Sequence, residues 1–154
     1  MIVIRSILHN LFVTAVGVVV ALVGTGLDRL IGINEFRSSI ATVVGSTLLL
    51  VGFLIRVWAT YYFYQNQMRV IATVPQGTLL ASGPYRYSRN PLYLGGNVFI
   101  FFGASVLLGS PMAVAITAFH LPLVNLFIRR EERQLAQRFG EDWARYKSAV
   151  RRWI

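Results

Sequence analysis

The chain has 154 residues, of which 55% are hydrophobic, a larger share than the roughly 45–50% of an ordinary soluble domain. This composition predicts a membrane protein with several spans. The net charge of +9 would suggest nucleic acid as a partner of a soluble protein, but here the basic residues flank hydrophobic segments. We therefore expect membrane lipid headgroups as the counter-charge, and no nucleic acid.

Metal chemistry is not expected either. The chain has no cysteine, so it offers neither disulfides nor thiolate ligands. Its two histidines, His9 and His120, lie far apart in the sequence and have no acidic residue near them. A metal centre would need several such ligands to converge.

Four hydrophobic segments are long enough to cross a membrane as helices, which takes about twenty apolar residues. They are residues 7–27, 38–64, 92–108 and 112–128. Gly109-Ser110-Pro111 predicts a tight antiparallel hairpin between the last two, because proline ends one helix and can begin the next. Arg56, late in the second span, is expected to extend toward the membrane interface. We predict an all-α integral membrane protein with a single domain over residues 1–154.

The basic residues predict the orientation of this domain. One Arg precedes the first span, three lie in the connection 65–91, and the tail 129–154 has eight Lys and Arg, whereas the opposite side has only Arg29 and Arg37. Cytoplasmic loops carry the excess of Lys and Arg in membrane proteins. Both termini, the loop and the tail should therefore be cytosolic.

The tail predicts a basic amphipathic helix that is broken near Gly140. Its basic residues alternate with hydrophobic ones, namely Leu135, Phe139, Trp143, Tyr146, Val150 and Trp153. Such a helix lies in the headgroup plane with its aromatic side chains toward the lipid. A plain membrane anchor explains the pattern fully.

The loop before the third span is held rigid by two prolines. Pro84 fixes its own φ angle, and Pro91 forces Asn90 into an extended conformation. Between the prolines lie Tyr85, Arg86, Tyr87 and Arg89. Their rings, hydroxyls and forked donors suit a ligand with an aromatic ring and a carboxylate. Alternatively, the loop is a plain connection with interfacial tyrosines and arginines that set the topology.

Two adjacent carboxylates, Glu131 and Glu132, follow the fourth span on the same predicted side of the membrane. Adjacent carboxylates repel each other and add nothing to a positive-inside topology. They could accept hydrogen bonds from ribose hydroxyls or from an ammonium group. The alternative is local ion pairing with neighbouring arginines of the same helix, Arg129, Arg130 and Arg133.

Five motifs occur in a fixed order between residues 52 and 150. They are Arg56-Val57-Trp58-Ala59, Gly83-Pro84-Tyr85, Arg89-x-Pro91-x-Tyr93-x-Gly95, Glu131-Glu132-x-x-Leu135 and Phe139-Gly140-x-x-Trp143-x-x-Tyr146. Together they resemble the isoprenylcysteine carboxyl methyltransferase and phospholipid methyltransferase group of integral membrane enzymes. The resemblance implies a site for S-adenosylmethionine at the cytosolic membrane surface.

The resemblance also implies which residues form the site. The cofactor contacts are Thr78, Leu79, Leu80, Tyr85, Asn90, Pro91, Leu92 and Tyr93, with Glu131 as the acidic contact. Arg89, Asn90 and Glu132 are the candidate catalytic residues.

This chain departs from the family pattern at two positions. Asn90 stands where the family usually has a histidine, and asparagine can form hydrogen bonds but cannot titrate. Asn90 suffices if that histidine only holds the cofactor, whereas a proton-transfer step would be lost. Phe127 stands where the eukaryotic carboxyl methyltransferases have an arginine thought to meet the substrate carboxylate. Arg129 and Arg130 are the nearby candidate substrate contacts, although they point to other sides of the helix.

We therefore expect an S-adenosylmethionine-dependent methyltransferase that acts on a hydrophobic or lipid-borne carboxylate or amine. A carboxylate acceptor needs no base at neutral pH, whereas an ammonium must first lose a proton. Two alternatives stay open: a non-catalytic membrane protein with a decayed cofactor site, and a reductase of the sterol-reducing type with a nicotinamide cofactor. A small multidrug exporter is disfavoured, because no predicted span contains a carboxylate.

Overall fold

The computed structural model describes residues 1–70 and 77–154, and the regular elements in these ranges are helices. In chain order they are α1 (Ile2–Ile31), α2 (Ser39–Gln65), η1 (Gly83–Arg86), α3 (Pro91–Tyr93), η2 (Leu94–Ile100), α4 (Phe101–Leu107) and α5 (Pro111–Ala149). The helices α1, α2 and α5 are long and apolar enough to cross a membrane, and α3, η2 and α4 together form a shorter apolar helix. The predicted all-α membrane fold is confirmed. Residues 71–76 of the predicted loop 65–91 lie outside the described residues.

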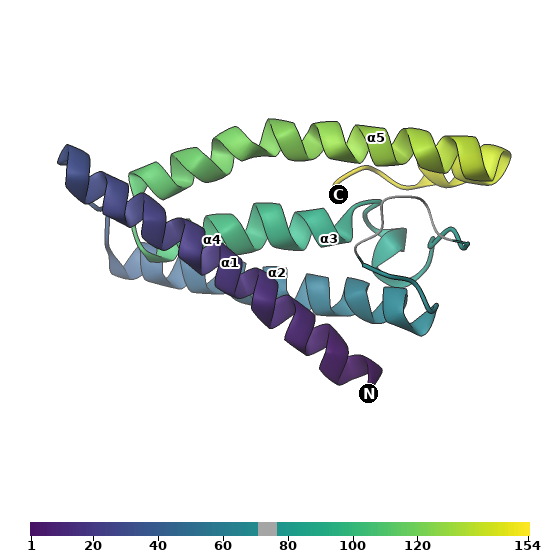
Figure 1. Cartoon of the computed structure of the whole chain (residues 1–154), viewed down its shortest axis with the longest axis horizontal. Coiled ribbons are helices and arrows are strands. Elements are labelled where there is room, and N and C mark those ends of the chain that lie inside the picture. Colours follow the sequence, from purple (N-terminus) through teal and green to yellow (C-terminus); the bar gives the residue numbers. More distant parts are fainter. Residues whose placement is uncertain (71–76) are drawn as a thin grey trace.

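The helices form a bundle that places the loop and the tail at one end. The rod of α3, η2 and α4 lies along α2, while α1 crosses the bundle and contacts α2, α4 and α5 (Figure 1). The last residues of the chain fold back from the end of α5 toward α3 (Figure 1). Segments that are far apart in the sequence therefore meet at the end of the bundle that holds η1.

Glycines let α2 pack closely against its neighbour. A Cβ atom at Gly52 would lie 2.6 Å from the Gly95 carbonyl oxygen, and one at Gly45 would lie 2.5 Å from the Leu107 backbone nitrogen. Any larger side chain would force the two backbones apart. Such close packing through small residues is usual for helices in membranes.

Asp28 follows directly after the predicted first span, residues 7–27, but the structure places it inside a helix. The helix α1 continues to Ile31, and Asp28 is fully buried. Its carboxylate accepts hydrogen bonds from the Ser110 hydroxyl (2.5 Å) and from the Met112 backbone N–H (3.0 Å). The first N–H groups of a helix lack partners within the helix and carry partial positive charge. Asp28 therefore ties α1 to the start of α5.

Arg56 does not extend toward the interface as expected. Only 7% of the residue is exposed, and its guanidinium turns inward between α1 and the start of the third span. Its Nε donates to the Asn10 side chain (2.8 Å) and its Nη1 to the Leu92 carbonyl (2.7 Å). Polar partners within the bundle thus replace the water or headgroups that a snorkelling arginine would reach.

The tail has the predicted break, but it uses its aromatic residues differently. Gly140 has a φ of 51° and a ψ of −117° and interrupts the helical path of α5. Beyond it, Trp143 and Tyr146 are buried in a cluster with Ala59, Leu80 and Tyr85. The expectation that these two rings face lipid is therefore wrong. They cover the end of α2 and the loop, because the break turns the last helical segment back onto them.

The Asp28 contact is expected to stabilise the fold. Asp28→Ala should lower the free energy of unfolding by about 2 kcal/mol, because it removes the helix cap and leaves the buried Ser110 hydroxyl without its acceptor. Thermal unfolding in detergent measures the effect. Glu35→Ala is the matched control, since Glu35 pairs with the exposed Arg29 and Arg37 on the same connection and should cost less than about 1 kcal/mol. Equal effects of the two substitutions would contradict this role.

Candidate functional site

A cavity of about 750 Å³ lies between the helices and the loop, which is within the usual size range of small-molecule sites. Loop and tail residues line one part of it, and they include Thr78, Leu79, Leu80, Tyr85, Trp143 and Tyr146. Residues of α1, α2, η2 and α5 line the other part, and they include His9, Phe12, Val13, Arg56, Asn97 and Phe127. The cavity thus has one wall made by the loop and tail and another made by the apolar bundle.

The structure brings most of the predicted site residues to this cavity. The lining includes Thr78, Leu79, Leu80, Tyr85, Arg89, Asn90, Pro91, Leu92, Tyr93, Arg130, Glu131 and Glu132. Arg129, predicted as a substrate contact, is exposed and is not part of the lining. Sequence reasoning did not assign His9, Arg56 or Asn97 to the site, although polar residues within hydrophobic spans are a signal of function.

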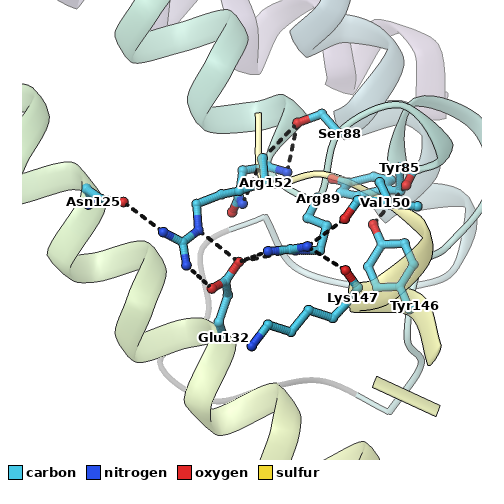
Figure 2. A network of polar contacts seen from close by, with 10 residues as sticks. Tyr85, Ser88, Arg89, Asn125, Glu132, Tyr146, Lys147, Val150 and Arg152 are labelled. Carbon is cyan, nitrogen blue, oxygen red and sulfur yellow. Dashed lines mark hydrogen bonds and ion pairs between the residues drawn. The ribbon is translucent and has the colours of Figure 1, made fainter. Parts of the chain in front are cut away.

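Glu132 joins three separate parts of the chain through ion pairs (Figure 2). Its carboxylate accepts from the loop residue Arg89 at 3.0 Å and from the tail residue Arg152 at 2.6 Å. These pairs link residues remote in sequence, so the alternative of local pairing with Arg129, Arg130 and Arg133 does not hold for Glu132. The side chains of Arg89 and Glu132 are only 8% and 11% exposed. The contact is therefore largely shielded from water.

The two arginines keep Glu132 ionised. Burial acts to raise the pKa of Glu132, but hydrogen bonds and charge from Arg152 and Arg89 outweigh it and hold the pKa below its ordinary value. The same hydrogen bond raises the pKa of Arg152. Glu132 lies beyond the predicted fourth span, where the network fastens the loop to α5.

Arg89 and Asn90 fasten the tail as well. Arg89 donates to the backbone carbonyls of Lys147 (2.9 Å) and Val150 (2.5 Å), which lie at the end of α5, where helical carbonyls lack partners. The Asn90 side-chain amide donates to the Arg152 carbonyl at 3.1 Å. In this conformation, the donors of Arg89 (Figure 2) and the amide of Asn90 hold the last residues of the chain against the loop.

Glu131 has a different environment from Glu132. It lines the cavity, makes no ion pair among the described residues, and is hydrogen-bonded to Tyr93. Burial raises the pKa of Glu131, and the adjacent charge of Glu132 adds to this, although the hydrogen bond from Tyr93 acts in the opposite direction. Its carboxylate is therefore free to accept further hydrogen bonds from a ligand.

Tyr85 has a buried hydroxyl that finds no hydrogen-bond partner in the described part of the chain. The residue is 6% exposed, lines the cavity, and its hydroxyl has no hydrogen-bond partner among the described residues. Burial raises the pKa of Tyr85 well above its ordinary value, so the phenol stays neutral and can donate. Buried polar groups are rarely left unpaired in folded proteins. This hydroxyl therefore indicates a place for a ligand acceptor.

The sequence from residue 40 to residue 142 matches the family model described as phospholipid methyltransferase. The chain belongs to this family. The matched region contains the loop, the acidic pair and the Gly140 break, whereas Arg152 and the first helix fall outside it. Most of the cavity is thus built from the family region.

The chain is also similar to a curated protein, the protein-S-isoprenylcysteine O-methyltransferase of Saccharomyces cerevisiae. The two are 29% identical over 123 residues, which cover 75% of this chain and 49% of that protein. The chain therefore spans about half the length of this relative. A search of solved structures found no match.

The Glu132 network is expected to make stability depend on pH. The folded pKa of Glu132 is lowered, so the stabilisation is present above its unfolded pKa of about 4.3 and is lost as the pH falls through the folded value. Glu132→Gln should lower stability by roughly 3 kcal/mol at pH 7, because two cations lose their anion. Thermal unfolding between pH 7 and pH 3 should show a smaller acid-induced loss in this variant.

The exposed Glu141 offers a matched control on the same helix. Glu141→Gln should change stability at pH 7 by less than about 0.5 kcal/mol. Glu141→Gln should lose as much stability between pH 7 and pH 3 as the unmodified chain does. If Glu132→Gln loses equally much, the Glu132 pairs are not the source of the acid-induced loss.

Proposed function

We propose that this chain is an S-adenosylmethionine-dependent methyltransferase that acts at the membrane surface on a hydrophobic or lipid-borne carboxylate or amine. The family membership supports a methyltransferase. The observation that carries the cofactor site is the buried Tyr85 hydroxyl, which has no partner within residues 1–70 and 77–154 and lies in a cavity that also presents Glu131. The distribution of Lys and Arg supports a cytosolic position of this site and of both termini.

The residues around the cavity fit this cofactor. Tyr85 offers a donor, and Glu131 offers an acceptor for ribose hydroxyls or an ammonium group. Leu79, Leu80 and Trp143 offer apolar surface for an aromatic base. When bound, S-adenosylmethionine supplies a methyl group on a sulfonium, and its carbon–sulfur bond breaks with the electron pair left on sulfur as the acceptor forms the new bond.

The protein's part in this reaction is alignment. Methyl transfer by in-line displacement needs the acceptor, the methyl carbon and the sulfur in one line within a dry site. The contacts of Glu132 with Arg89 and Arg152 hold the loop wall of the cavity in place. We assign Glu132 and Arg89 to positioning, because their polar atoms contact each other and the tail in this conformation.

Asn90 has a positioning role in this proposal. Its amide fastens the tail through the Arg152 carbonyl, and it cannot titrate where the family usually has a histidine. If the acceptor were an amine, Glu131 would be the carboxylate suited to accept the proton. Its pKa is raised by burial, whereas the pKa of Glu132 is held low by two arginines despite burial.

Cofactor binding by Tyr85 and Glu131 can be measured by titration calorimetry on the detergent-solubilised chain. Tyr85→Phe and Glu131→Gln should each weaken S-adenosylmethionine binding by roughly tenfold, because the first removes a hydrogen-bond donor and the second removes a negative charge and replaces an acceptor oxygen by a donor. Tyr85→Phe should not lower thermal stability without cofactor, since the hydroxyl has no protein partner among the described residues. Tyr87→Phe, in the exposed part of the same loop, is the control and should bind normally.

The same titration separates the alternatives. No binding at millimolar S-adenosylmethionine would overturn the proposed function and favour a decayed site. Binding of a nicotinamide nucleotide in its place would favour the reductase. Unchanged affinity in Tyr85→Phe would remove Tyr85 from the cofactor site while leaving the function standing.

A further inference from the structure

Arg56 is a buried cation inside the bundle whose partners carry no negative charge. Its guanidinium donates to the Asn10 amide oxygen and to the Leu92 carbonyl, and its Nη2 lies 3.4 Å from the His9 Nε2. An arginine has only donors, so these three contacts involve an amide, a carbonyl and an imidazole as acceptors. A guanidinium has five N–H groups, so two of them have no acceptor among the described residues.

None of the acidic residues of the described chain forms an ion pair with Arg56. The sequence has six, and residues 71–76, outside the described ranges, contain none of them. Asp28 caps α5, Glu35 and Glu132 each pair with two other arginines, and Asp142 pairs with Arg145. Of the remaining two, Glu131 lines the same cavity as Arg56 but is hydrogen-bonded to Tyr93 and forms no ion pair among the described residues, and Glu141 is exposed on the tail.

A buried charge without a counter-charge is costly, especially inside a membrane. Arg89 illustrates the usual solution, because its guanidinium is balanced by Glu132. Arg56 has no such partner in the described structure, yet it lines the cavity. The missing counter-charge is thus one that a molecule in the cavity could bring.

The neighbouring backbone is shaped around this guanidinium. A Cβ atom at Gly95 would lie 2.7 Å from the Arg56 Cγ, and one at Gly96 would lie 2.7 Å from its Nη1. Both glycines belong to the π-helical stretch η2, and such stretches are frequent at functional sites. The two glycines and the hydrogen bonds to Asn10 and Leu92 therefore hold the cation in one position.

We propose that Arg56 binds the anionic group of the acceptor, and that the acceptor is a hydrophobic carboxylic acid. The inference rests on the proposed methyltransferase function and narrows its acceptor from a carboxylate or an amine to a carboxylate. The apolar chain of the acid would lie along Phe12, Val13 and Phe127, which line the same part of the cavity. Arg56 contacts Leu92, a proposed cofactor residue, so an anion held by Arg56 lies beside the cofactor site.

The chemistry of a carboxylate agrees with these surroundings. A carboxylate oxygen forms the bond to the methyl carbon with its own lone pair, so no proton has to leave the acceptor. The product is a neutral methyl ester, which loses the charge attraction to Arg56 and is free to leave. An amine acceptor would instead have to shed its proton and react beside a fixed positive charge.

Head-group selectivity tests this proposal without turnover. Oleate and oleyl alcohol have the same hydrocarbon chain but differ in charge, so their binding to the full chain in uncharged detergent micelles isolates the anionic group. With S-adenosylhomocysteine present, oleate should bind at least about tenfold more tightly than the alcohol. Arg56→Gln should reduce this preference to less than about twofold and leave the affinities for the alcohol and for S-adenosylhomocysteine unchanged.

Arg5→Gln is the matched control, because it removes one cation from the same end of α1 and α2 without touching the cavity lining. It should keep the preference for oleate. Equal binding of both lipids to the unmodified chain, or a preference that survives in Arg56→Gln, would overturn the inference. Loss of S-adenosylhomocysteine binding in Arg56→Gln would show that the anion on Arg56 belongs to the cofactor or that Arg56 is structural, and would also overturn it.

The type of product gives a second readout that does not depend on a folded variant. With methyl-labelled cofactor and a total lipid extract, a methyl ester releases its label as methanol in alkali, whereas a methylated amine keeps it. Alkali-labile label supports the inference, and alkali-stable label overturns it. The proposed function fails separately, through absence of S-adenosylmethionine binding in the calorimetric titration.

Discussion

The ion pairs of Glu132 with Arg89 and Arg152 are the contact on which the rest of the site depends. Among the described residues of the loop only η1 is helical, and the tail beyond Gly140 leaves the helical path of α5. Glu132, on α5 before the Gly140 break, fixes both to this helix. Two cations share one anion in a place largely shielded from water, so removing the anion would leave both arginines without compensation.

This contact also determines the wall of the cavity. With the tail held down, Trp143 and Tyr146 pack against Tyr85 and Leu80, and the Tyr146 hydroxyl donates to the Tyr85 carbonyl at 2.8 Å. The Tyr85 ring is then buried with its own hydroxyl at the cavity. The unpartnered donor is therefore a consequence of how the tail is fastened, and the loop alone would not create it.

Two buried arginines, Arg89 and Arg56, differ in whether a carboxylate of the chain balances their charge. This difference leaves positive charge in one part of the cavity. Arg89 is neutralised by a residue of the chain, whereas Arg56 is held by neutral groups. The cavity lining also includes the segment from Asn90 to Tyr93 and Glu131, whose carboxylate forms no ion pair among the described residues. A ligand in the cavity thus meets an acceptor at Glu131 and a cation at Arg56. Asn90, which leaves the family pattern, fastens the tail through its amide in this arrangement.

The sequence by itself determined the all-helical membrane fold, the Gly109-Ser110-Pro111 hairpin and the break at Gly140, because hydrophobic length and Gly or Pro effects are local. The distribution of Lys and Arg predicted that the loop and the acidic pair lie on one side of the membrane, and the family resemblance implied that both contact one cofactor. Only the tertiary structure decided which partners individual polar and aromatic side chains contact. Arg56, Asp28 and Trp143 each turned to partners on other helices or the loop, and Glu131 and Glu132 acquired opposite pKa shifts. Spacing along one helix cannot reveal such partners, because they lie tens of residues away and the packing of the whole bundle brings them together.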